Sequence, residues 1–102
     1  MSSRSEIRFN FNQALAQASE LDSLADRLEQ LENKTENSMQ TLSAAWKGQN
    51  ATAFLRKEDT LKKEVRKTAL EIHSIADDIR RIARRIYEAE MAALRIAQQR
   101  KS

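Results

Sequence analysis

The 102-residue sequence contains no cysteine and no proline, and it has a single glycine, Gly48. Without cysteine, disulfide bonds are excluded and the redox compartment is unconstrained. Without proline, the chain has few positions at which a helix must end. Five aromatic residues are also too few to build the core of a compact globular domain. These absences favour long helices, each of which needs only a narrow apolar stripe.

Long apolar runs are absent as well. Residues 1–6 are polar and lack the apolar core of about 7–15 residues that a signal peptide carries. No window approaches the roughly 20 apolar residues of a membrane span. By the rules of the general export route, we expect a soluble cytoplasmic protein without stable membrane insertion.

What the chain does contain is typical of helix. Alanine, leucine, glutamate, lysine, arginine and glutamine are abundant, and the length suits a single domain over residues 1–102. We expect a first helix at about 6–45. Its apolar residues recur at spacings of three and four, and polar Glu32 interrupts the series. The series is Ile7, Phe11, Ala14, Ala18, Leu21, Ala25, Leu28, Thr35, Met39 and Leu42, with Leu24 and Leu31 widening it.

A second helix is expected at about 51–98, with a more regular seven-residue repeat. Glu58 is the one charged residue in register, four residues before Lys62, with which it could pair. Alanines 69, 76, 83 and 97 lie beside the seam and are small enough to let a facing helix approach closely. The predicted seam is Phe54, Leu61, Val65, Thr68, Ile72, Ile75, Ile79, Ile82, Ile86, Ala89, Ala93 and Ile96.

Between the helices, at about 46–50, we expect the turn. Gly48 can take a positive φ without a Cβ penalty, and Asn50 could cap the second helix. A short loop between two such helices predicts an antiparallel hairpin. One hairpin leaves apolar surface uncovered, so we expect it to dimerise into an all-α four-helix bundle. Opposite charges favour the pairing, since residues 1–46 carry seven acids and four bases (net −3) and residues 47–102 eight acids and fourteen bases (net +6).

Residues suited to catalysis are scarce. His73 is the only histidine, so neither a Cys/His pair nor a multi-histidine metal site can form within one chain. We expect His73 to be a surface or boundary side chain. Asp77 and Asp78 are neighbours on a helix and point about 100° apart, which does not suit paired acid–base work. The sequence therefore predicts no enzyme, no cofactor and no metal site.

The strongest charged patch is the basic run at residues 80–85, with arginines at 80, 81, 84 and 85. It could contact the phosphates of nucleic acid or anionic lipid. Alternatively, the arginines form a solvated border beside the seam, and this interpretation is favoured. Acids flank the run, no aromatics interleave it, and the net charge of +3 is small, so nucleic acid is not the expected partner.

Trp46 allows two interpretations. Its ring could be a buried anchor that covers the seam over Phe54, or an exposed recognition residue at the loop. In a dimer it could also form part of a groove with the partner's termini, a role that aromatic residues often take at interfaces.

Two amphipathic helices around a central Trp-X-Gly, in a chain of about a hundred residues, resemble the WXG family of small type VII (ESX) secretion substrates. Leu42, Trp46, Gly48, Ala51 and Phe54 stand where that family carries such residues. The resemblance implies a hairpin that forms a four-helix bundle as a homodimer or as a heterodimer with another member. It also implies a secreted protein, exported without a cleaved signal peptide by an FtsK/SpoIIIE-like ATPase.

The family's C-terminal export signal, Tyr-X-X-X-Asp/Glu, is not matched, because Met91 stands four residues after Tyr87 and Glu90 only three. A looser pattern of the family, hydrophobic-xxx-Asp/Glu-xx-hydrophobic-xxx-hydrophobic, can be laid on Ile86, Glu90, Ala93 and Ala97. We therefore expect a secreted substrate whose Trp46–Gly48 loop and C-terminal helix are recognised together. The alternatives are a targeting chaperone for a larger effector and, less favoured, a helical protein that binds nucleic acid or a membrane surface.

Overall fold

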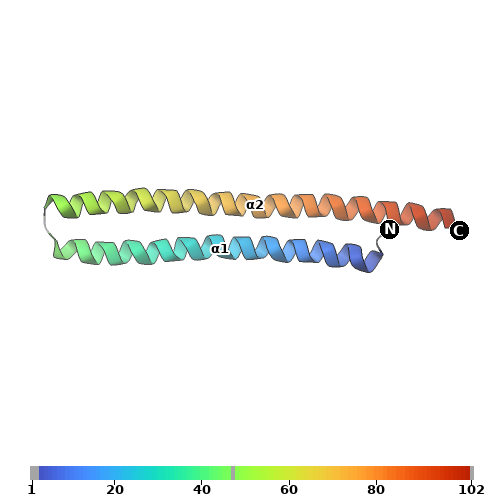
Figure 1. The fold of residues 1–102 in the computed structure, drawn as a ribbon, viewed down its shortest axis with the longest axis horizontal. Helices are drawn as coiled ribbons and strands as arrows, with labels where there is room; N and C mark the ends of the chain where they lie inside the picture. The colour runs from blue at the N-terminus through green and yellow to red at the C-terminus, as the bar shows by residue number, and fades with distance from the viewer. Residues whose placement is uncertain (1–2, 47, 102) are drawn as a thin grey trace. The chain divides into compact units, whose positions relative to one another are not determined.

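A computed structural model describes residues 3–46 and 48–101 of the chain. It has two α-helices, α1 (Arg4–Ala45) and α2 (Gln49–Lys101), joined by a short loop that contains Gly48 (Figure 1). The described residues contain no β-strand. The prediction of an all-α two-helix hairpin is therefore confirmed.

Local hydrogen bonds explain where the helices begin. The Ser3 hydroxyl accepts a hydrogen bond from the Glu6 amide at 3.2 Å and caps α1. The helix therefore begins at Arg4, two residues before its predicted start. At the other helix, the Thr52 amide donates to the Gly48 carbonyl at 3.4 Å. Because α2 already begins at Gln49, Asn50 lies inside the first turn, and the expectation that Asn50 caps this helix is wrong.

The chain divides into two compact units, each made of one segment of α1 and one of α2. The first, which we call the loop unit, is Asp22–His73 and includes the turn. The second, the terminal unit, joins the part of α1 up to Leu21 to the part of α2 from Ser74 onward.

Alanines are the most deeply buried apolar residues of α1 and α2. Five of them are at most 8% exposed and repeat at intervals of seven residues on each helix; we call this set the alanine seam: Ala18, Ala25, Ala69, Ala76 and Ala83. Because a methyl group is the smallest apolar side chain, alanines at these positions let two helix backbones approach closely. Among the residues that the structure describes, Ile7 and Ala51 are the other buried apolar ones.

The predicted seam of α2 is only partly correct in its position around the helix. Four of its members are half-buried: Phe54, Val65, Ile72 and Ile79. Several of its large members are between 43% and 53% exposed: Leu61, Ile75, Ile82, Ile86 and Ile96. Ile75 and Ile82 each directly precede a buried alanine, and successive residues lie about 100° apart on an α-helix. The α2 helix thus carries two adjacent apolar stripes, and contact with α1 uses the small one.

Two charged residues occupy buried positions of the loop unit. Glu32 on α1 continues the spacing of Ala18 and Ala25, and it is 5% exposed. Glu58 on α2 is 4% exposed. The two acids that interrupt the apolar series in the sequence therefore lie in the interior of one unit, where apolar side chains are the norm.

Candidate functional site: the Trp-X-Gly loop and the C-terminal segment of α2

The loop depends on the conformation of Gly48. Its φ is +110°, a value that L-residues with a side chain rarely adopt. A Cβ at this position would meet no atom within 4 Å. Glycine is therefore required by the backbone conformation and not by lack of space. The central residue of the motif, Lys47, lies outside the described residues.

Trp46 follows the last residue of α1, and its amide donates to the Ser43 carbonyl at 3.1 Å. Its ring meets the Phe54 ring edge-on, with centroids 5.5 Å apart and planes at 67°. This is the favoured T-shaped geometry of an aromatic pair. The tryptophan is still 47% exposed. One part of the ring is therefore fixed by packing while the remainder is open to a partner.

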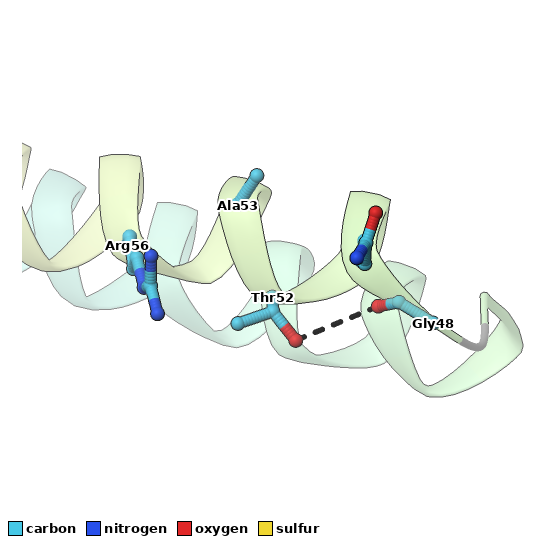
Figure 2. A pocket seen from close by; sticks show the side chains of 5 residues that line it. Gly48, Thr52, Ala53 and Arg56 are labelled. Carbon is cyan, nitrogen blue, oxygen red and sulfur yellow. Dashed lines mark hydrogen bonds between the residues drawn. The ribbon is translucent and has the colours of Figure 1, made fainter.

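The predicted motif residues at the start of α2 have different environments. Ala51 is 9% exposed, while Phe54 is half-buried beneath Trp46. Figure 2 shows an open hollow on the same turns, lined by Gly48, Gln49, Thr52, Ala53 and Arg56. In it the Thr52 hydroxyl points back to the Gly48 carbonyl at 3.5 Å. The loop thus presents an exposed aromatic ring directly after α1 and an open hollow at the start of α2.

The C-terminal residues singled out in the sequence divide into exposed and half-buried positions. Ile86 is 53% exposed and Ala93 is also exposed, whereas Glu90 and Ala97 are half-buried. At about 100° per residue, these four positions fall within an arc of roughly 60° on α2. They therefore share one side of the helix.

Tyr87 has a structural contact of its own. Its ring stacks on Phe11 of α1, with centroids 4.7 Å apart and planes at 30°. The Arg84 guanidinium lies 5.6 Å from the centroid of the Phe11 ring, within the range of a cation–π interaction. Tyr87 thus helps to hold α1 against α2 in the terminal unit.

Two arginines of the basic run form ion pairs with neighbouring acids. Arg80 pairs with Asp77 at 3.0 Å, and Arg81 pairs with Asp78 at 2.9 Å. These are i,i+3 pairs, so the acids and bases that the sequence sets side by side neutralise one another locally. With Arg84 on Phe11 as well, this geometry favours the interpretation of the run as a solvated border.

His73 is more involved than its sequence position indicated. Its Nδ1 lies 2.6 Å from Oδ1 of Asp22, and its Nε2 lies 3.4 Å from Oδ1 of Asp26. The hydrogen bond to the Asp22 carboxylate raises the pKa of His73 above its usual value. Burial acts in the opposite direction, and the negative charges of Asp22, Asp26 and Glu29 add to the increase. The spacing of Asp22 and Asp26 puts both on one face of α1, but sequence alone does not show which α2 residue lies opposite.

The pKa of Glu58 is raised to about 7. The largest cause is a hydrogen bond to the Glu32 carboxyl, which exists only while one of the two groups holds a proton. Burial and the negative charges of Glu32 and Glu36 act in the same direction, and the positive charge of Lys62 opposes them. The sequence suggested that Lys62 pairs with Glu58, but its Nζ instead lies 2.7 Å from Oε2 of Glu36.

The described residues define a class of protein: a two-helix hairpin with a glycine-dependent turn, an exposed tryptophan beside that turn and exposed aliphatic side chains along its helices. A comparison with protein families identifies the family. The model of the WXG100 family, described as proteins of 100 residues with WXG, matches residues 6–91. The chain therefore belongs to the WXG100 family.

WXG100 is a family of type VII secretion substrates, whose members are non-enzymatic secreted helical hairpins that typically form dimers. No curated protein and no solved structure matches the chain. Within the described residues, neither helix has an apolar stretch sufficient to cross a membrane.

Proposed function

We propose that this protein is a substrate of a type VII secretion system, exported as a helical dimer and recognised by an FtsK/SpoIIIE-like ATPase. The observation that carries the proposal is the family match over residues 6–91, with the Trp46–Gly48 loop inside the matched segment. The exposed surfaces of the hairpin support each step of the mechanism.

Exposed leucines mark a docking face on the loop unit. Leu24 and Leu31 are 41% and 60% exposed, and each directly precedes a buried residue of α1. Leu61 on α2 is 43% exposed and directly precedes half-buried Lys62. In an antiparallel pair, the residue before an inward-facing one lies on the same side of the pair in both helices. The three leucines therefore belong to one face.

The terminal unit has a corresponding stripe on α2. Ile75, Ile82, Ile86 and Ile96 are each about half exposed, at 50% to 53%. Large aliphatic side chains gathered along one helix are typical of a surface that is covered by a partner. A second hairpin, either another copy or a WXG relative, would cover these side chains and complete a four-helix bundle.

Recognition by the ATPase would then use two features together. The first is the open part of Trp46 with the hollow beside it, and the second is the side of α2 that carries Ile86, Glu90, Ala93 and Ala97. Within a dimer, the loop of one hairpin and the C-terminal segment of its partner would present these features as one composite surface. The contact of Tyr87 with Phe11 supports this arrangement, because it holds the start of the C-terminal segment in a defined orientation.

Export of Trp46→Ala and Trp46→Phe from a bacterium with a type VII system tests the proposal. We expect Trp46→Ala to be made and folded but absent from the culture filtrate, and Trp46→Phe to be exported in part. Phe9→Ala is a matched control, because Phe9 is an aromatic residue of α1 that is 65% exposed and lies far from the loop in sequence. Normal secretion of a folded Trp46→Ala protein would refute the recognition role.

The same strains distinguish a targeting chaperone from a substrate. A substrate leaves the cell, whereas a chaperone for a larger effector would be recovered in a complex with that effector. Recovery of such a complex with no protein in the filtrate would replace the proposed function by the chaperone role.

A further inference from the structure

Three glutamates of the loop unit form a cluster between α1 and α2. Glu32 and Glu58 are more than nine-tenths buried. Glu36 lies one turn after Glu32 on α1, and its side chain is 23% exposed, which leaves an opening to solvent. One carboxylate oxygen from each of the three residues lies within 4.8 Å of the others.

When both Glu32 and Glu58 are ionised, the buried oxygens of this cluster have no hydrogen-bond donor. Both carboxylate oxygens of Glu58 and Oε1 of Glu32 are unpartnered. Lys62 is the ammonium group at the cluster, and it lies on Glu36, 2.7 Å from Oε2. With all three carboxylates ionised, one lysine leaves a net charge of −2. Burial of unpartnered carboxylates is costly, so the cluster favours a positively charged occupant.

The geometry suits a single ion. Two oxygens bound to one Ca²⁺ at about 2.3–2.6 Å lie no more than about 5 Å apart, and the 4.8 Å limit of the cluster falls within this range. All three ligands are carboxylate oxygens, the donors that hard cations such as Ca²⁺, Mg²⁺ and Mn²⁺ prefer. Mg²⁺ holds its ligands at about 2.0–2.1 Å and would need a tighter cluster.

We propose that Glu32, Glu36 and Glu58 bind a divalent cation of the Ca²⁺ class, which joins α1 to α2 near the loop. The cation would supply to Glu32 and Glu58 the positive charge that Lys62, which lies on Glu36, does not bring to them. Water could complete its coordination through the opening at Glu36. The sequence pattern did not indicate this site, because Glu58 lies on a different helix from Glu32 and Glu36.

Calorimetric titration of the metal-free full-length protein with Ca²⁺ tests the proposal, with Mg²⁺ and Mn²⁺ as comparators. We expect one Ca²⁺ per chain and a melting temperature, followed by circular dichroism, that rises with Ca²⁺ concentration. Glu58→Gln keeps the shape of the side chain and should weaken Ca²⁺ binding by about tenfold or more, because it removes a charged ligand.

Glu88→Gln is the matched control, since it removes the same charge from an exposed position of α2 and should bind Ca²⁺ as the wild type does. If Glu58→Gln fails to fold, Glu36→Gln at the edge of the cluster replaces it as the test. The proposal is overturned if none of the three cations binds or shifts the melting temperature at millimolar concentration. It is equally overturned if the Glu58→Gln or Glu36→Gln protein binds Ca²⁺ as tightly as the wild type.

Discussion

The exposed isoleucines of α2 give the sharpest test of the proposed dimer. Ile75 and Ile82 are 51% and 50% exposed in the hairpin. Full burial of an isoleucine side chain contributes about 1.5–3 kcal/mol of favourable free energy. Because each of these side chains is half exposed in the hairpin, association can gain roughly half of that free energy, about 0.8–1.5 kcal/mol for each side chain. The double substitution Ile75→Ala with Ile82→Ala removes most of this gain.

In a homodimer the substitution affects four side chains, two from each copy. The expected loss is therefore about 3–6 kcal/mol of association free energy, which weakens the dissociation constant by roughly 10²- to 10⁴-fold. Sedimentation equilibrium over a range of protein concentrations measures this constant. A co-encoded WXG relative is the second titrant, in case the partner is a different chain.

Leu70→Ala is the control for this experiment. Leu70 is 67% exposed and directly follows the buried Ala69, whereas Ile75 and Ile82 precede buried alanines. Leu70 therefore lies on the opposite side of α2, away from the proposed interface, and its truncation should leave association unchanged. The reasoning is refuted if the wild type stays monomeric both alone and with the WXG relative. It is also refuted if the double variant associates as tightly as the wild type.

Three further substitutions test the interior of the hairpin. Ala76→Leu should lower the free energy of unfolding by about 1–3 kcal/mol in urea denaturation, because it overpacks the alanine seam; equal stability would exclude close packing there. Gly48→Ala should also lower the free energy of unfolding, by about 1 kcal/mol or more, because alanine is strained at a φ of +110°. An unchanged free energy of unfolding would contradict the described turn. His73 has a raised pKa, so its stabilising effect should be complete below about pH 6.5 and be lost as pH rises through the higher folded value. His73→Gln should remove this part of the pH dependence, which lies above about pH 6.5. The contribution of Glu58 is present in both proteins and cancels in the difference between their curves; identical curves would refute the Asp22 contact.

The helices and the turn could be predicted from the sequence because each rests on local information. The seven-residue repeats define two helices, and Gly48 is the only residue that takes a positive φ without strain. The bounds differ by a few residues, since Ser3 rather than a later residue caps α1 and Gln49 already begins α2. The contact of Trp46 with Phe54 was one of two interpretations, and the half-exposed ring combines features of both.

The inward side of α2 could not be predicted from periodicity. Two stripes lie side by side on this helix, and both repeat every seven residues. Hydrophobicity alone selects the stripe with Ile75 and Ile82, since isoleucine is the more apolar residue. The structure instead buries Ala76 and Ala83, because close approach of two backbones requires small side chains on both helices.

Contacts between α1 and α2 could not be predicted from the sequence either, because they depend on the register of one helix against the other. The pairing of His73 with Asp22 and of Lys62 with Glu36 joins residues that no local rule connects. Glu32 and Glu58 were each visible as a charged interruption in an apolar series. Because each of these two glutamates interrupts the apolar series of its own helix, the sequence could have suggested that Glu32 and Glu58 face each other.

The alanine seam also determines how the hairpin comes apart. A methyl group buries little apolar area. Separation of α1 from α2 at the alanine seam therefore exposes less apolar surface than separation of two helices joined by leucines over the same length. Each alanine therefore contributes little apolar area to holding the two helices together, and the aromatic and charged contacts between α1 and α2 carry a larger share.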